Sequence, residues 1–342
     1  MLNLFKRFFP AAKPETGPLA DTLASGRADS PSVLILSASK KNQNYYRDLE
    51  LAQQTRAVFL GENFDFEPHG FQIEKVVAAL FGGRKPDYIF LNYNHGYTHR
   101  LKGFEQLGIP IFAFVGDHYD FTDSRERAKV KQAFYQALPL AALVTAYPHT
   151  NAIVAEALGH PDLPFIHLPW AIDPSVFRDL GEKRRYDIAC LGAHTDTKYP
   201  FRRQVRAYLE QQKELRFFKK QRVCGHDGVL FNKALNRMRS AFTCASVFQY
   251  TLMKYFEIPA AGALLFAEET QDLAGLGFKD GETFVKVTPA DFAEKFRHYL
   301  IGDGREQGEQ IRRAGNAFVR NNHTWALRIQ GLLKEFEKYG RQ

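Results

Sequence analysis

The chain has 342 residues, 45 % of them hydrophobic and 25 % charged, which is the balance of an ordinary globular protein with room for two hydrophobic cores. Its three cysteines are widely spaced, which excludes a disulfide framework and the usual zinc motifs and favours a reducing, cytoplasmic setting. The net charge of +8 suits an anionic partner, but no basic patch interleaved with aromatic residues is present, so no nucleic-acid partner is expected.

Residues 1–31 are predicted to be an N-terminal tail and linker. The tail begins MLNLFKRFFP, in which apolar side chains surround Lys6 and Arg7 before a proline ends any helix. The segment is too short to span a membrane or to form the core of a signal peptide. Apolar residues beside two cations favour at most a weak contact of residues 1–11 with an anionic membrane surface. We therefore expect a cytoplasmic protein that can lie at the inner face of the cell membrane.

From Ser32 the chain alternates short apolar runs with amphipathic segments, the pattern of a parallel sheet covered by helices on both faces. Right-handed crossovers between such strands predict a doubly wound, Rossmann-like domain over residues 32–170. The expected strands of this domain are 33–36, 87–91, 109–115, 140–145 and 165–168, and the expected helices are 46–60, 71–81, 99–107, 123–137 and 149–158.

The alternation pauses in a proline-containing segment, and residues 171–185 are predicted to be an interdomain linker. It then resumes, which predicts a second Rossmann-like domain over 186–320 and a C-terminal helix in 321–342. The expected strands are 187–191, 215–223, 241–245, 263–266 and 283–287, and the expected helices are 200–212, 230–239, 250–260, 270–276, 290–300, 305–320 and 324–338. The fold class is α/β, with the strands' carboxyl ends facing a cleft between the domains.

An anion site is expected at the start of the second domain. Gly192 follows the first strand in DIACLGAH, and KYPFRR leads into the next helix. A glycine there lets a ligand approach the backbone, and a helix N-terminus favours an anion. Arg202 and Arg203 in the first helical turn could contact phosphate oxygens, or they could be two exposed arginines after a tight turn.

A second signal is the acid in MKYFEIPAAGALLF. Glu257 lies where a helix gives way to a central strand, and Gly262 turns the chain into that strand. A carboxylate facing the cleft can accept hydrogen bonds from two neighbouring hydroxyls, as the acid of dinucleotide-binding folds does with ribose. Gly262 would then leave room for the ligand. Alternatively, Glu257 is an exposed helix residue and Gly262 an ordinary helix C-cap.

The stretch KYFEIPAAGALLFAEETQDLAGLGFKDGETFVKV resembles the donor-binding segment of glycosyltransferases with the two-domain GT-B fold. It looks most like the bacterial branch of glycosyltransferase family 1 and spore-maturation (CgeB-like) proteins. LPWAIDPSVF, YDIACLGAH followed by YPFRR, and the tail HTWALR match further motifs of that family in the right order. The similarity covers roughly residues 165–335, and it implies a GT-B architecture with C-terminal helices.

The resemblance carries over to few residues. Glu257 matches the second acid of the family's E-x7-E pattern, which holds the nucleotide ribose, and Lys254 matches a basic position suited to the diphosphate. The first acid of the pattern is replaced by Gln249. Gln249 can still hydrogen-bond a sugar, but the missing charge leaves the inverting or retaining outcome open. In this fold, bases and helix ends commonly replace a metal, so no cofactor or metal is expected.

The first domain offers acid–base candidates in FAFVGDHYDFTD. Asp117 and His118 follow an expected strand and would face the cleft, where either could act as general base for an acceptor hydroxyl. An oxygen-rich metal site including Asp120 and Asp123 is the less favoured alternative. His95 in NYNHGYTH and His194 across the cleft are rivals for the catalytic role.

Together these features predict a glycosyltransferase that moves a sugar from a nucleotide-sugar donor, UDP-linked on family grounds, to a hydroxyl of a cell-surface glycan or related acceptor. Two alternatives remain open. A sugar-nucleotide epimerase shares the architecture, although its expected paired acids are not seen. A non-catalytic nucleotide- or sugar-binding protein is compatible with the loss of an acid at Gln249.

Overall fold

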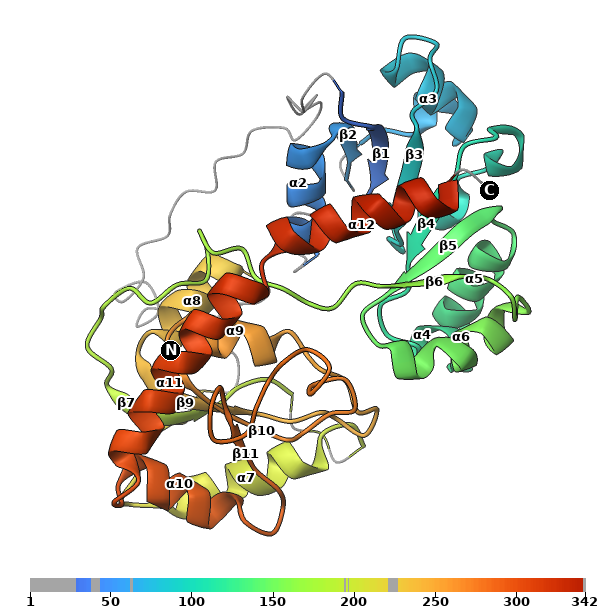
Figure 1. Cartoon of the computed structure of the whole chain (residues 1–342). Coiled ribbons are helices and arrows are strands. Elements are labelled where there is room, and N and C mark those ends of the chain that lie inside the picture. Colours follow the sequence, from blue (N-terminus) through green and yellow to red (C-terminus); the bar gives the residue numbers. More distant parts are fainter. Residues whose placement is uncertain are drawn as a thin grey trace, which may run out of the picture.

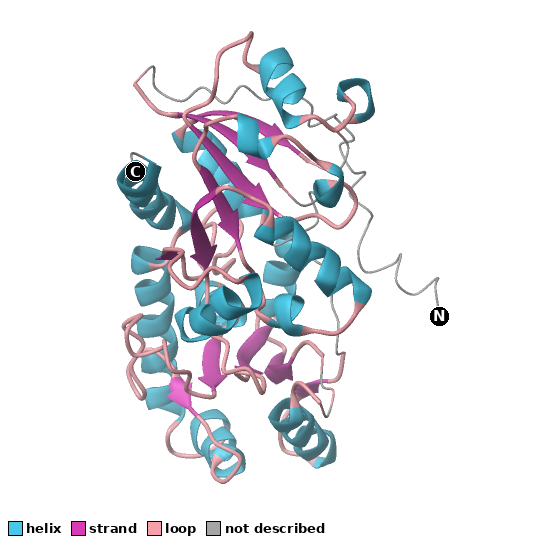
Figure 2. Cartoon of the chain, turned by 90° about the vertical axis from the view of Figure 1, so that its right-hand side faces the viewer, coloured by secondary structure: helices cyan, strands magenta, loops and turns pink. Residues whose placement is uncertain are grey.

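The computed structural model describes residues 29–37, 44–61, 64–193, 195, 197–220 and 227–340. Within them the chain forms two α/β domains, each built on a parallel sheet (Figure 1). Figure 2 shows the two sheets one above the other, with helices around each. The predicted fold class, two doubly wound parallel-sheet domains with C-terminal helices, is confirmed. Among the described residues, no helix is long and apolar enough to cross a membrane, and residues 1–11 lie outside the described part.

The first domain has a six-stranded sheet in the order β2-β1-β3-β4-β5-β6, with every pair parallel. The strands are almost continuous apolar runs because both faces of the sheet are covered. The order reverses between β1 and β3, which makes these two strands the topological switch point. The elements are β1 (Ser32–Leu36), α2 (Tyr45–Gln54), β2 (Arg56–Leu60), α3 (Ile73–Leu80), β3 (Tyr88–Asn92), β4 (Ile111–Phe114), α4 (Tyr119–Thr122), α5 (Glu126–Gln136), β5 (Leu140–Thr145), α6 (Asn151–Leu158) and β6 (Phe165–His167).

The second domain has a five-stranded parallel sheet in the order β11-β10-β9-β7-β8. Here the switch point lies between β7 and β9. The elements are β7 (Tyr186–Cys190), α7 (Pro200–Gln211), β8 (Phe217–Phe218), α8 (Gly228–Leu235), β9 (Met238–Thr243), α9 (Lys254–Ala260), β10 (Leu264–Ala267), β11 (Val285–Lys286), α10 (Phe292–Leu300), α11 (Arg305–Asn322) and α12 (Trp325–Gly340).

The chain crosses between the domains twice, and the two crossings are hydrogen-bonded to each other. The Ile172 N–H donates to the His323 carbonyl, and the Trp325 N–H donates to the Ile172 carbonyl, both at 3.0 Å. Beyond this point α12 leaves the second domain and packs on the first (Figure 1). There Phe336 stacks on Phe112 with ring centroids 3.9 Å apart. The two connecting segments therefore run side by side between the domains.

Several expected elements are wrong. The helix predicted over 46–60 ends at Gln54, because Thr55 has an extended backbone, with φ −133° and ψ 167°, and the following apolar residues form β2. The helix predicted over 99–107 is only two short 3₁₀ turns, separated by Gly103 with a left-handed φ of 85°. Residues 270–276 form consecutive turns rather than a helix, and the strand expected over 215–223 is reduced to β8.

Candidate functional site

The candidate site lies where the carboxyl ends of β7 and β9 meet, the switch point of the second sheet. Gly192 follows β7 with a φ of 106°, a backbone conformation that L side chains rarely adopt. A Cβ added there would lie 3.1 Å from Arg202 Nη1 and 3.5 Å from Lys254 Cε. Arg202 and Lys254 therefore lie close to Gly192, although the three residues were selected from separate motifs.

Arg202 is the central cation of this group. It lies in the first turn of α7 and is only 2 % exposed. Its Nη1 donates to the Ala193 carbonyl at 2.7 Å, and its guanidinium lies 4.2 Å from the centroid of the Tyr199 ring. Its Nε and Nη2 have no hydrogen-bond partner among the described residues. A buried guanidinium with unpaired N–H groups beside an open backbone glycine is suited to bind an anion.

Glu257, on α9 near Lys254, supplies a buried hydrogen-bond acceptor. The residue is 1 % exposed, so the alternative of an exposed helix position is excluded. Burial raises the pKa of its carboxyl to about 7, although the nearby Lys254 ammonium opposes the rise. Its Oε2 has no donor among the described residues. A buried carboxylate oxygen without a donor is costly unless a ligand supplies one.

The loop between β9 and α9 forms one wall of the site. Ser246 and Gln249 both have left-handed backbone conformations, with φ of 64° and 58°. Such conformations are uncommon for residues other than glycine and often mark ligand loops. The loop is anchored by its own backbone, since the Tyr250 N–H donates to the Ala245 carbonyl at 2.8 Å and the Val247 N–H donates to the Lys198 carbonyl at 3.0 Å. Gln249 is half-buried on this loop.

His118 meets the same loop from the first domain. Its backbone N–H donates to the Tyr250 hydroxyl at 3.1 Å, and its Nδ1 lies 2.6 Å from that hydroxyl. If the tyrosine proton is donated to Nδ1, the neutral imidazole carries its own proton on Nε2. Burial lowers the pKa of His118, as does the neighbouring His149, which favours this neutral form. His118 is then a hydrogen-bond donor toward its surroundings rather than a proton acceptor.

Of the two adjacent candidates, Asp117 and His118, Asp117 is the one that can accept a proton. It follows the carboxyl end of β4. Burial raises the pKa of its carboxyl, and a hydrogen bond from Tyr119 opposes the rise. Asp117 also interacts electrostatically with Lys198 of the second domain. A carboxylate whose pKa is moved toward neutrality and that faces the other domain has the properties of a general base.

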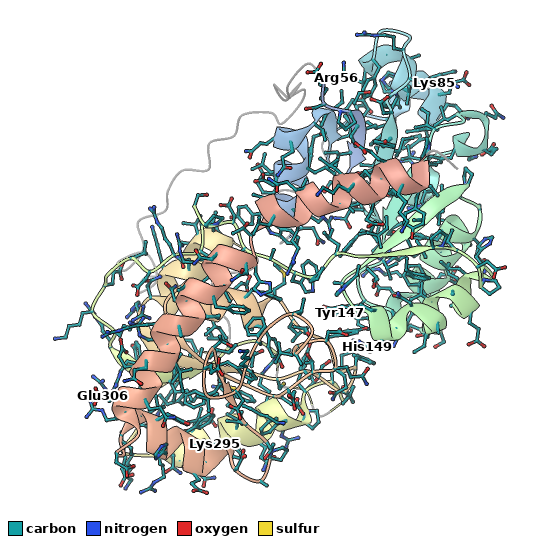
Figure 3. All side chains as sticks on the ribbon, viewed as in Figure 1. Arg56, Lys85, Tyr147, His149, Lys295 and Glu306 are labelled. Atoms are coloured by element: carbon teal, nitrogen blue, oxygen red, sulfur yellow. The ribbon has the colours of Figure 1, made fainter. Side chains whose placement is uncertain are left out.

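The first and second domains are in direct contact through His149 and Tyr147, which Figure 3 shows on the side of the first domain facing the second. His149 Nε2 lies 3.0 Å from the Phe248 carbonyl and Nδ1 lies 3.3 Å from Asp272 Oδ2. Tyr147 stacks on Tyr250, with ring centroids 3.9 Å apart. The loops around the site are therefore held together across the domain boundary.

Some predicted site residues lie elsewhere. Arg203 is exposed, so of the two arginines only Arg202 is turned into the protein. Gly262 precedes β10 at the amino-terminal end of the sheet, opposite to the site, and a Cβ there would lie 2.3 Å from Asp179 Oδ2. It is a helix C-cap that leaves room for the linker, not for a ligand. His95 lines a cavity of the first domain that Asp117 also lines, and His194 lies outside the described residues.

The sequence interpretation missed Tyr250, Tyr147 and His149. The one signal for Tyr250 was its position directly after Gln249. Tyr147 and His149 lie on a loop whose contacts with the second domain form only when the domains pack together. Asp120 pairs with Lys131 at 3.1 Å and Asp123 pairs with Arg125 at 2.7 Å, which gives both acids protein partners. Across the ranges described, no group of three histidine, cysteine or acidic residues is arranged to hold a metal ion.

Part of the chain matches a known family. Residues 175–334 match the family described as "Glycosyl transferase-like", a span that contains Gly192, Arg202 and Glu257. No curated protein sequence matches the chain significantly.

Three solved structures illustrate the similarity in fold. HepE from Anabaena, solved in complex with UDP and glucose, has a TM-score of 0.56 at 9 % identity, with 90 % of this chain and 100 % of that chain covered. A glycosyltransferase from Rickettsia africae has a TM-score of 0.56 at 9 % identity, with coverage of 91 % and 99 %. Sucrose-phosphate synthase from Thermosynechococcus elongatus has a TM-score of 0.54 at 11 % identity, with coverage of 89 % and 98 %. The chain therefore has the GT-B fold, and its second domain is glycosyltransferase-like.

Proposed function

We propose that the protein is a glycosyltransferase that transfers a sugar from a nucleotide-sugar donor to an acceptor hydroxyl. The observation that carries the proposal is the presence of two buried side chains with unsatisfied polar atoms, Arg202 on α7 and Glu257 on α9, in the second domain. Arg202 Nε and Nη2 lack acceptors and Glu257 Oε2 lacks a donor among the described residues. A nucleoside diphosphate supplies both, as phosphate oxygens and ribose hydroxyls.

The donor is proposed to lie with its diphosphate against Gly192, Arg202 and Lys254. The absence of a Cβ at Gly192 allows the phosphates to approach the backbone, and the start of α7 adds the positive end of a helix. Glu257 would accept hydrogen bonds from the ribose. UDP is the favoured nucleotide, and this choice is supported by the HepE structures, which hold UDP or UDP-glucose.

Transfer forms a bond between the acceptor oxygen and the anomeric carbon, and breaks the bond from that carbon to the diphosphate oxygen. The nucleoside diphosphate leaves with the bonding electrons, and we assign the acceptor proton to Asp117. Arg202 and Lys254 would stabilise the negative charge that develops on the leaving group, so the proposed mechanism needs no metal or other cofactor. His118 would donate its Nε2 proton to an oxygen of the bound donor.

The acceptor is proposed to bind to the first domain, since Asp117 belongs to it. The motifs KYFEIPAAGALL and HTWALR support a finer assignment to the spore-maturation branch, with a cell-surface glycan or related molecule as acceptor. We further propose a cytoplasmic enzyme that contacts the inner face of the cell membrane through residues 1–11.

The test is donor turnover. The purified chain is incubated with UDP-glucose, UDP-galactose and UDP-N-acetylglucosamine, with and without a mixture of glycan acceptors, and released UDP and sugar products are measured. The proposal expects UDP release with formation of a glycosidic product. Interconversion of the sugar nucleotide without an acceptor would show an epimerase instead. Nucleotide binding without any sugar turnover would show a non-catalytic binding protein.

A further inference from the structure

A second cavity lies at the carboxyl ends of β3 and β4 in the first sheet, beside the switch point between β1 and β3. It has a volume of about 330 Å³ and contains Asp117 at its wall. Ligands of doubly wound folds bind outside the carboxyl ends of the strands where the strand order reverses. Its other lining residues include Asn92, Tyr93, His95, Asp120, Lys131 and Trp170.

Tyr93 is the residue that indicates a ligand. It is 9 % exposed, yet its hydroxyl has no hydrogen-bond partner among the described residues. The ring is fixed by its neighbours, since the His95 ring packs edge-on at 4.8 Å between centroids and the Phe134 ring lies at 5.8 Å. A buried hydroxyl without a partner is costly, and a ligand in the cavity can supply one.

The charges around the cavity balance. Asp117 and Asp120 are opposed by Arg127 and Lys131. The Lys131 ammonium is buried and held in place, because it donates to the Val115 carbonyl and to Asp120 Oδ2, both at 3.1 Å. With two acids against two bases, the lining has no excess charge to attract a phosphate or a carboxylate.

The chemistry of the walls is that of a carbohydrate site. Aromatic rings of Tyr93, Phe114 and Trp170 alternate with amide, carboxyl and ammonium groups, so that a ligand finds both apolar faces and hydrogen-bond partners. The volume is at the lower end of the range for small-molecule pockets, about 300–1,000 Å³. It suits one or two sugar rings and not a long apolar chain.

We propose that this cavity binds the acceptor as an uncharged, hydroxyl-bearing monosaccharide unit, with the Tyr93 hydroxyl hydrogen-bonded to it and Asp117 beside its reacting hydroxyl. The inference rests on the proposed glycosyltransferase function. It adds the substrate class of the acceptor and a specificity residue, Tyr93, that the sequence analysis does not select.

The test compares Tyr93→Phe with a matched control, Tyr135→Phe. Both changes remove one buried hydroxyl from neighbouring rings. The Tyr135 hydroxyl donates to the Phe114 carbonyl at 2.8 Å, so its loss costs stability, whereas the Tyr93 hydroxyl has no described partner to lose. Acceptor and donor KM are measured with glucose, galactose, N-acetylglucosamine and glucuronate as acceptors, together with the melting temperature and its shift by UDP.

The expected result is a rise of about five- to tenfold in the acceptor KM of Tyr93→Phe, the effect of one lost hydrogen bond. Its donor KM and its UDP shift should equal those of the unchanged protein. Its melting temperature should equal or exceed that of the unchanged protein. Tyr135→Phe should melt at a lower temperature with an unchanged acceptor KM. An unchanged acceptor KM in Tyr93→Phe, or a preference for glucuronate over the neutral sugars, would overturn the inference while UDP still binds. Loss of the UDP shift in the unchanged protein would instead remove the proposed function, and this inference with it.

Discussion

Replacing Glu257 by glutamine should change how the stability of the unliganded protein depends on pH. Glutamine keeps the size of the side chain but cannot ionise. In the unchanged protein, burial raises the pKa of the Glu257 carboxyl from its ordinary 4.5 to about 7. The folded state therefore holds this proton more tightly than the unfolded state. Its stabilising contribution is fully present below pH 4.5 and is lost as the pH rises through 7.

The size of the effect follows from the shift. Each pKa unit corresponds to about 1.36 kcal/mol, so a rise from 4.5 to about 7 makes the folded protein roughly 3 kcal/mol less stable at pH 8 than at pH 4.5, as far as Glu257 is concerned. The unfolding entropy of a chain of 342 residues is about 0.7 kcal/mol per degree. The corresponding change in melting temperature is about 4 °C.

The assay is a series of melting curves of both proteins between pH 5 and pH 8.5. Other titrating groups are common to the two proteins and cancel in the difference. We expect Glu257→Gln to gain about 4 °C relative to the unchanged protein between the two ends of the series. Saturating UDP should stabilise the unchanged protein more than the variant at pH 8, because ribose hydroxyls then donate to the ionised carboxylate. Parallel pH profiles would refute the account of a buried, unsatisfied acid.

Three further outcomes are expected. Gly192→Ala should abolish the UDP-induced melting shift, because the left-handed backbone disfavours alanine and a Cβ would lie 3.1 Å from Arg202 Nη1; a normal shift would contradict this. Donor turnover should survive EDTA, because Arg202 and Lys254 provide the positive charge; activity lost with EDTA and restored by magnesium would move attention to Asp117 and Asp120. Deleting residues 1–11 should lower the amount of protein that sediments with vesicles containing anionic lipid, and equal sedimentation would remove the proposed membrane contact.

The fold could be predicted from the sequence because each buried parallel strand is a continuous apolar run followed by an amphipathic segment. The failures have local causes. In residues 46–60 the end of α2 and the start of β2 share one apolar pattern. Thr55 stands at the change from helix to strand. Residues 270–276 have a composition typical of helices. In the structure they form turns, in which the N–H groups of Leu273 and Leu276 donate to earlier carbonyls. Both are cases in which tertiary packing overrides periodicity.

The site was partly predictable. Gly192, Arg202, Lys254 and Glu257 were found because they stand at strand ends or in a motif, and the structure brings the first three into contact distance. Periodicity could not decide which arginine of the pair 202–203 turns inward. Contacts such as His118 with Tyr250 join residues 132 positions apart, and they depend on how the domains pack. Nothing in a single sequence encodes the unpaired Tyr93 hydroxyl.

The central claim is that the switch point of the second sheet binds a nucleoside diphosphate, and the most direct test is a melting-temperature panel with UDP, GDP, TDP and ADP. A ligand at one hundred times its Kd stabilises the folded state by about 2.7 kcal/mol, which for this chain is about 4 °C. We expect UDP to give this shift, and Arg202→Met, which removes the two unpaired guanidinium nitrogens, to eliminate it without lowering the melting temperature of the free protein by more than a degree or two. No shift with any of the four nucleotides at millimolar concentration, or a full UDP shift in Arg202→Met, would contradict the account.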